Sequence, residues 1–363
     1  MPKPQLRFRL LLPLLIGCGD GAPDDVIDPD TVPTEPGETD LVDTDAVDTD
    51  APDTDPADTD PADTEPTDTD PTDTDPADTD PPATLYPAAV YDCSLPLPSP
   101  PFTWREVRGV ETTEDIAFDT QGNLIGSVLN GPIAAWRRNG NRTLVAAPGE
   151  TRGLDLLPDG RLIVSDPDLG VLNAIDITTG AITLHAILDV GMAGIDVDAD
   201  GWVYASSISR IPASIYAVRP DGDFWRFSEI GPDSQGYGVA LSPDELRLYS
   251  SRYNAAEIWV SDRQPGGAFG AATRWTTGTG VGFAGMVTDT CGNLYAMDAF
   301  RCDVWRFDPT TGAGEVIFSG RRGLYCANLA FGRGLGGFGA TQLYVSTYEA
   351  VIEIDYGVPG RPR

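Results

Sequence analysis

The sequence predicts an all-β fold, a six-bladed β-propeller with four-stranded blades, and three observations lead to it. A phrase of apolar strand, Asp/Pro/Gly turn and second apolar strand recurs six times between Ile116 and Ile354. The second strands of successive copies begin 38, 41, 45, 46 and 49 residues apart, which is the length of a propeller blade. Residues 85–363, which hold all six copies, also approach the size at which a single hydrophobic core stops growing, and a ring of small inter-blade cores avoids that limit. The second-strand copies begin at Leu124, Leu162, Val203, Leu248, Leu294 and Leu343.

The N-terminus predicts export and a lipid anchor. Residues 1–17 have a cationic start and an apolar run, Leu10–Ile16, which is typical of a signal peptide and too short to span a bilayer. Leu15–Cys18 resembles a bacterial lipobox, and this resemblance implies cleavage before Cys18 and lipidation of Cys18. The alternative is a plain signal peptide with an incidental cysteine. We expect the lipid anchor to make the membrane a partner and to place the protein outside the cytoplasm, in the bacterial cell envelope, at the outer membrane or cell surface.

Residues 18–84 predict a disordered acidic linker. Between residues 20 and 84 there are 24 acidic residues and no basic ones, in a low-complexity pattern of Asp-Thr-Asp and Pro. A segment with this much charge and so few apolar residues cannot bury enough surface to fold. We interpret it as a stalk between the membrane and the propeller. A weak Ca²⁺ sponge is the alternative, although nothing in the pattern preorganises a site.

The charge of the folded part argues against nucleic acid as a partner. The whole chain carries a formal net charge of -32, but most of it lies in the linker, and residues 85–363 carry only -11. Binding of nucleic acid requires a cationic surface that neutralises phosphates. No nucleic acid partner is therefore expected.

The blades follow in order along residues 85–363. Asp-Gly and Pro-Asp-Gly turns separate their strands, and bulky residues such as Trp136, Tyr216, Trp259 and Trp305 on the third strands predict inter-blade core. The sixth blade lacks an outer strand, and we expect residues 102–108 to supply it and so close the ring. The predicted blades span 115–146, 153–188, 193–228, 237–275, 283–318 and 327–355.

Four cysteines follow Cys18, and an even number in an exported chain predicts two disulfides. Topology selects among the three possible pairings. The loops that hold Cys302 and Cys326 should both lie at the end of the ring where the first strands begin, called here the top. Cys93 and Cys291 should both lie at the other end. We therefore predict Cys302–Cys326 and Cys93–Cys291, with free buried thiols as the alternative.

Candidate ligand-binding residues come from the top of the channel, where each first strand begins. By register these positions are Glu114, Arg152, Ala193, Tyr237, Ala284 and Ala327, with Asn328 next to the last. We predict that Glu114, Arg152, Tyr237 and Asn328 bind a ligand. A simple ion pair between Glu114 and Arg152 is the alternative.

At this point the chain resembles the SMP-30/gluconolactonase/strictosidine synthase-like propellers, which share their blade phrases with NHL-type propellers. The resemblance covers about residues 105–355 and rests on phrases such as Tyr237–Asp244 and Ala284–Met286. It implies a divalent metal, such as Ca²⁺, held by a Glu, an Asn and an Asp. Glu114 matches the Glu, whereas Tyr237 and Ala284 stand where the Asn and the Asp would be. We therefore expect neither the metal nor any other cofactor.

Other catalytic arrangements find little support in the sequence. The single histidine, His185, lies in a predicted outer strand, so a multi-His metal site or a Ser-His-Asp triad is not expected. The serines at the ends of the second strands are interpreted as packing residues rather than nucleophiles. We accordingly assign no catalytic residue and favour a non-catalytic propeller that binds an unknown protein or small molecule at its top face. Two alternatives remain. One is a divergent hydrolase of lactones or esters that uses Glu114, Asp115, Arg152, Tyr237 and Asn328, and only this alternative includes Ca²⁺ or another divalent metal. The other is a purely structural envelope protein.

Overall fold

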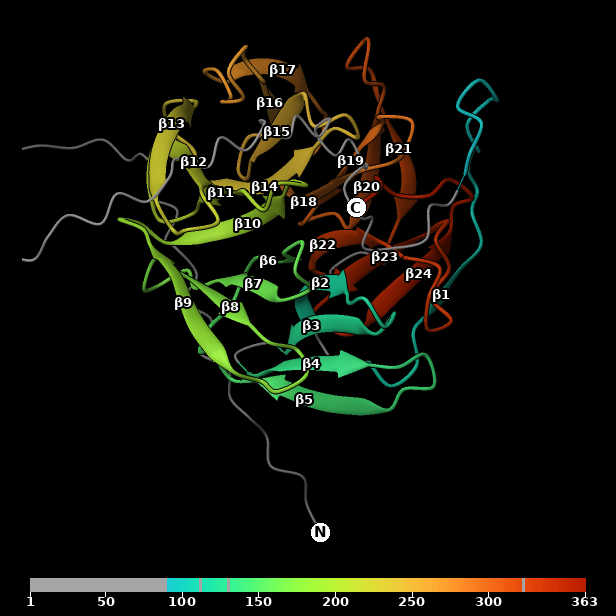
Figure 1. Cartoon of the computed structure of the whole chain (residues 1–363). Coiled ribbons are helices and arrows are strands. Elements are labelled where there is room, and N and C mark those ends of the chain that lie inside the picture. Colours follow the sequence, from blue (N-terminus) through green and yellow to red (C-terminus); the bar gives the residue numbers. More distant parts are fainter. Residues whose placement is uncertain (1–89, 111–112, 129–130, 322–323) are drawn as a thin grey trace, which may run out of the picture. The chain divides into compact units, whose positions relative to one another are not determined.

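The described part of the chain is a six-bladed β-propeller (Figure 1). The computed structural model describes residues 90–110, 113–128, 131–321 and 324–363. These contain six four-stranded antiparallel sheets and no helix, so the predicted fold is confirmed. The expected signal peptide (1–17), the lipidated Cys18 and the linker (18–84) lie outside the described residues.

In each sheet the strands follow in chain order from the channel to the rim, except that the rim strand of blade six is Trp104–Glu106 (Figure 1). Blade one comprises β2 (Thr113–Phe118), β3 (Leu124–Val128), β4 (Ile133–Trp136) and β5 (Arg142–Ala146). Blade two comprises β6 (Leu154–Leu156), β7 (Leu162–Ser165), β8 (Val171–Ile175) and β9 (Ile182–Ile187). Blade three comprises β10 (Met192–Val197), β11 (Val203–Ser207), β12 (Ala213–Val218) and β13 (Phe224–Ile230). Blade four comprises β14 (Gly236–Leu241), β15 (Arg247–Arg252), β16 (Glu257–Asp262) and β17 (Thr273–Thr277). Blade five comprises β18 (Phe283–Thr288), β19 (Leu294–Asp298), β20 (Asp303–Phe307) and β21 (Gly314–Ser319). Blade six comprises β22 (Cys326–Phe331), β23 (Gln342–Thr347), β24 (Val351–Asp355) and β1 (Trp104–Glu106).

The two ends of the propeller share blade six, as expected. β1 pairs antiparallel with β24, with Trp104 opposite Ile354 and Glu106 opposite Ile352. This pairing gives the last sheet its fourth strand and covers an edge that would otherwise be open to other chains. The predicted closure by residues near 102–108 is confirmed.

Apolar side chains fill the spaces between neighbouring blades. Each pair of adjacent blades shares one cluster of buried residues among those described, and no cluster spans the whole ring. The third-strand aromatics predicted as core contribute as expected: Trp136 and Tyr216 are buried, and Trp259 is half-buried against its cluster. The ring thus gains its hydrophobic stabilisation from many small interfaces rather than from one core.

A β-bulge interrupts the start of the inner strand in five of the six described sheets. The register shifts between Thr113 and Ile116 in blade one, and between Gly236 and Val239 in blade four. The same shift occurs in blades three, five and six. A bulge places two residues opposite one, so one backbone N–H loses its partner in the ladder.

Three serines at the ends of second strands each accept an N–H from the start of their inner strand and connect their blade to the next. In blade four, the Ser251 Oγ accepts from Gly238 N at 2.8 Å and donates to Ala284 O of blade five at 3.2 Å. Ser165 joins blade two to blade three in the same way, and Ser346 joins blade six to blade one. We call these three residues the serine staples. They are structural residues, as the sequence suggested, and in blades four and six each accepts the N–H of a bulge residue.

Both predicted disulfides are present. Cys302–Cys326 joins the loop before β20 to the start of β22, and so fastens blade five to blade six. Cys93–Cys291 joins the N-terminal segment to the turn between β18 and β19. The pairing deduced from the two ends of the ring is confirmed.

Replacing the Ser251 staple should destabilise the fold measurably. Ser251→Ala leaves the Gly238 N–H and one bond of the Ala284 carbonyl unsatisfied in a buried place, at a cost of about 1–3 kcal/mol. The neighbouring Ser250 is a matched control, because its buried hydroxyl has no hydrogen-bond partner among the described residues. Urea unfolding should therefore show a clear loss for Ser251→Ala and little change for Ser250→Ala. Equal effects would contradict the staple.

Candidate ligand-binding site at the top of the channel

The first residue of each inner-strand bulge, or its equivalent in blade two, lies at the same end of the channel. We call this end the upper mouth. Its position follows from the register. Ile116, Leu154 and Val239 pair with equivalent residues of their second strands and so form one layer across the ring. The residues two positions before this layer form the mouth: Glu114, Arg152, Ala193, Tyr237, Ala284 and Ala327.

Three of the four predicted ligand-binding residues meet at the upper mouth. Arg152 Nη1 donates to Glu114 Oε1 at 3.1 Å, and the Tyr237 hydroxyl donates to the same oxygen at 3.1 Å. The ion pair that the sequence analysis gave as an alternative is therefore present. The contact joins blades one, two and four across the channel.

The electrostatics of this group favour a charged arginine that is partly open to solvent. Burial raises the pKa of Glu114, while the Arg152 charge and the Tyr237 hydroxyl oppose that shift. Burial alone would lower the pKa of Arg152, but Glu114, Tyr237 and Glu150 raise it on balance. The Arg152 side chain is 29% exposed, whereas that of Glu114 is 6% exposed. Arg152 is thus the group of this pair that a ligand can reach.

Asn328, the fourth predicted residue, lies one position further along its strand and faces a different partner. Its amide donates to the buried Asp115 carboxyl group, and its Oδ1 accepts from Leu329 N at 2.7 Å. Asp115 also accepts from Ile116 N at 2.7 Å and Leu154 N at 2.8 Å. Both polar atoms of the Asn328 side chain are therefore used within the protein, which favours a structural role. We call the level of the channel just below the mouth, where Asp115 and Asn328 lie, the throat.

Glycines make this throat narrow. Four inner strands carry glycine at the level of Asp115 and Asn328. A Cβ on Gly285 would lie 1.8 Å from Asn328 Oδ1, and one on Gly238 would lie 2.3 Å from Ala284 O. Neighbouring inner strands approach so closely here that a side chain cannot be inserted without moving the backbone.

A group of aromatic residues beside the mouth was not predicted from the sequence. The ring of Tyr253 stacks on that of Tyr237 at 5.2 Å, and its hydroxyl lies 2.8 Å from that of Tyr325. Tyr325 also packs against Tyr348 at 4.5 Å, and Phe300 lies beside both Tyr253 and Tyr325. A signal was available, since Tyr253 and Tyr348 directly follow second strands and Tyr325 directly precedes an inner strand, all at the top of the ring. We call Tyr237, Tyr253, Tyr325 and Tyr348 the tyrosine wall.

The residues at the mouth do not fit a divalent metal. The Arg152 guanidinium already provides the cation on the Glu114 carboxylate, Tyr237 donates a hydrogen bond to that carboxylate, and Ala284 offers no ligand atom. Ca²⁺ requires six or more oxygen ligands. Among the described residues, no group of three or more His, Cys, Asp or Glu is placed to hold a metal ion.

Neither the acidic turn after β18 nor His185 forms part of the candidate site. In the turn after β18, Asp289 Oδ1 accepts from Cys291 N and Asn293 N, both at 2.9 Å. Its carboxylate thus organises a hairpin turn rather than a calcium loop. His185 lies in the outer strand β9, far from the mouth in its own sheet, as expected.

Comparison with known proteins supports the fold. No protein-family model matches the sequence, and no curated protein sequence does. Among solved structures, the gluconolactonase XC5397 from Xanthomonas campestris has 17% identity and a TM-score of 0.59, over 71% of this chain and 90% of the other. The calcium-binding protein regucalcin from Agrobacterium tumefaciens has 20% identity and a TM-score of 0.59, over 72% and 96%.

A structure with a different named activity is similar as well. Virginiamycin B lyase from Staphylococcus aureus has 14% identity and a TM-score of 0.50, over 70% of this chain and 87% of the lyase. Proteins with different activities thus share this architecture with the chain. At these identities the likeness concerns the fold, which is that of the gluconolactonase/regucalcin (SMP-30)-like six-bladed β-propellers.

Proposed function

We propose that the chain is a membrane-anchored, extracytoplasmic lipoprotein whose propeller binds a ligand or partner at the upper mouth without catalysing a reaction. One observation carries the binding proposal. At the mouth, a partly exposed arginine stands beside a wall of tyrosines, and it pairs with Glu114 where the metal-dependent relatives implied by the sequence resemblance would hold a cation.

The chemistry of the mouth favours a ligand with an anionic group and a flat or ring-shaped face. A guanidinium has five N–H donors in a planar fork, and the Glu114 and Glu150 contacts leave some of them for a carboxylate or similar acceptor. Tyrosine rings provide rigid, amphipathic surface on which such a face can stack.

The two disulfides support the proposed compartment. Such bonds persist in oxidising surroundings outside the cytoplasm and are rare inside it. No helix among the described residues is long and apolar enough to cross a membrane. In this proposal, the lipid on Cys18 attaches the protein to the cell envelope, and residues 18–84 separate the propeller from the membrane.

A binding experiment tests the role of the mouth. Small carboxylates that carry an aromatic or sugar-like ring are screened by thermal shift, and hits are measured by calorimetry. Arg152→Gln should weaken a hit at least tenfold, because it removes the charge-assisted bonds to the anion. Arg226→Gln is the matched control, since Arg226 pairs only with Glu229 on the outer strand β13 among the described contacts. A ligand bound equally well by both variants would place the site elsewhere.

A second candidate function, hydrolysis of a lactone or ester, is favoured by the fold neighbours and by Asp115. Burial raises the pKa of Asp115 to about 8, although the Leu154, Ile116 and Asn328 donors oppose the shift. Perturbed carboxyl groups occur often at catalytic sites. However, Asp115 is 2% exposed and its oxygens are engaged by those three donors, so a structural role explains it equally well.

Metal analysis joined to a hydrolysis screen separates the two candidate functions. The purified protein should contain no stoichiometric Ca²⁺ and should show no turnover of lactones or esters above the level of a Glu114→Ala variant. The reason is that Arg152 provides the cation on Glu114 and that Ala284 provides no ligand. Stoichiometric Ca²⁺ together with activity that Glu114→Ala abolishes would establish the hydrolase instead.

The raised pKa of Asp115 predicts how stability changes with pH. Between about pH 4 and 8, the Asp115 carboxyl keeps its proton in the folded protein and loses it in the unfolded chain. The unfolded state then binds fewer protons, so stability falls as pH rises, by at most about 1.4 kcal/mol per pH unit from this group. Urea unfolding at pH 5 and pH 8 should show a larger loss for the wild type than for Asp115→Asn. A parallel loss in both would show that Asp115 does not carry the dependence.

A further inference from the structure

The segment Val358–Arg363 follows β24, and the C-terminus lies near the inner strands rather than at the rim (Figure 1). We call this end of the channel, opposite the upper mouth, the lower end. The segment first crosses blade five, where Thr290 N donates to Pro359 O and Arg361 N donates to Thr288 O, both at 3.0 Å. It then contributes Gly360, Arg361 and Arg363 to the lining of a cavity of about 70 Å³. Inner-strand residues from all six blades line the same cavity, so this segment lies on the axis of the ring.

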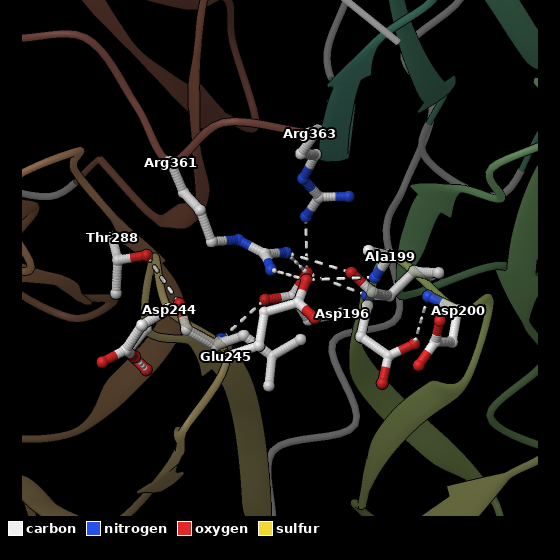
Figure 2. Close-up of polar contacts among 12 residues, drawn as sticks. Asp196, Ala199, Asp200, Asp244, Glu245, Thr288, Arg361 and Arg363 are labelled. Carbon is white, nitrogen blue, oxygen red and sulfur yellow. Dashed lines mark hydrogen bonds and ion pairs between the residues drawn. The ribbon is translucent and has the colours of Figure 1, made fainter. Parts of the chain in front are cut away.

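Arg361 is held by blades three and four. Its side chain is 5% exposed, and Nη2 donates to Asp196 Oδ1 at 2.7 Å and to Val197 O at 3.0 Å. Nη1 donates to Glu245 Oε1 at 3.2 Å. Figure 2 shows the guanidinium directed at these carboxylates. Three acceptors fixed in different directions match the planar fork of a guanidinium and not the point charge of an ammonium group.

Arg363 bridges two inner strands. Its guanidinium donates to Asp155 of blade two and to Asp196 of blade three. Together, Arg361 and Arg363 provide two positive charges for these two aspartates. The segment therefore connects blades two, three, four and five to blade six, from which it comes.

Backbone N–H groups of the neighbouring blades hold Asp155 and Asp196 in place. Asp155 Oδ2 accepts from Val197 N at 3.0 Å, and Asp196 Oδ2 accepts from Leu241 N at 2.7 Å. Each carboxylate thus uses one oxygen to join its blade to the next and directs the other at the arginines. The side chains of Asp155 and Asp196 are only 10% and 7% exposed, and buried charges of one sign are costly unless they are paired.

We propose that the lower end of the channel is a binding site for an arginine-bearing peptide segment, which this protein fills with its own residues 358–363. The recognised chemistry is a pair of guanidinium groups two residues apart on a segment whose backbone forms a single bridge to blade five. Asp155, Asp196 and Glu245 bind the guanidinium groups, and Thr288 and Thr290 of blade five bind the backbone. This proposal concerns the lower end alone and does not depend on the function proposed for the upper mouth.

The test uses the full chain and a free peptide. The double variant Arg361→Gln, Arg363→Gln should melt about 5–10 °C below the wild type, because it leaves buried carboxylates without their partners. Arg321→Gln is the control, since Arg321 and its partner Glu349 are both exposed, and its melting temperature should change by less than about 1 °C.

The peptide Val-Pro-Gly-Arg-Pro-Arg then distinguishes a binding site from a general effect of charge. It should raise the melting temperature of the double variant in a concentration-dependent way, and leave the wild type, whose site is filled, nearly unchanged. Val-Pro-Gly-Gln-Pro-Gln should have no effect on either protein. Equal effects of the two peptides, or no loss of stability in the double variant, would overturn the proposal.

A double-mutant cycle keeps the proposal testable if the double variant does not fold. Arg361→Gln and Asp196→Asn are made singly and together in the full chain. If Arg361 acts by binding Asp196, the combined loss in melting temperature should be clearly smaller than the sum of the single losses. Additive losses would show that the two side chains do not act on each other and would overturn the assignment.

Discussion

The inner edge of every blade faces the channel, where no further strand is available to pair with it. A buried backbone N–H without a partner costs as much as a lost hydrogen bond, so each inner strand needs acceptors from elsewhere. Side chains of the preceding blade provide several of them: Asp115 accepts from Leu154 N, and Asp155 accepts from Val197 N. The ring is therefore closed at its axis by side-chain carboxylates and hydroxyls, in addition to the apolar surfaces between the blades.

This requirement explains why charged groups lie deep in the channel. A carboxylate is a strong acceptor for a backbone N–H, but its charge must be balanced when it is buried. Arginines provide the balance at both ends, Arg152 for Glu114 at the upper mouth and Arg361 for Asp196 below. Between them lies a layer of apolar residues that includes Ile116, Leu154 and Val239 and separates the two charged groups.

The blades, and the closing strand that the incomplete sixth blade requires, could be predicted from the sequence, whereas the course of the segment after the last copy could not. Six copies of a strand phrase define six blades, and the end of the ring at which each cysteine lies selects the disulfide pairing. The segment 358–363 belongs to no copy, so nothing in the repeat places Arg361 on the axis. An arginine is ordinarily expected in solvent.

In the candidate site, too, some residues could be placed from the sequence and others could not. Register was enough to bring Glu114, Arg152 and Tyr237 together, because all three occupy the same position in their blades. Asn328 differs by one position, and a difference of one residue at a bulge changes the partner that a side chain faces. Tyr253 and Tyr325 lie in loops, whose course the strand pattern does not determine.

The bulges also make the upper mouth a suitable place for binding. Tyr237 directly precedes Gly238, whose N–H the Ser251 staple holds, and the carbonyl of Glu114 accepts from Ser346 of blade six. The backbone that carries these residues is thus fixed from two sides before any ligand arrives. A site whose groups are already in place loses less conformational freedom on binding, so more of the contact energy appears as affinity. The bulges and the serines that hold them therefore link ring closure to the rigidity of the mouth, and the loops with Tyr253, Tyr325 and Tyr348 supply the surface around it.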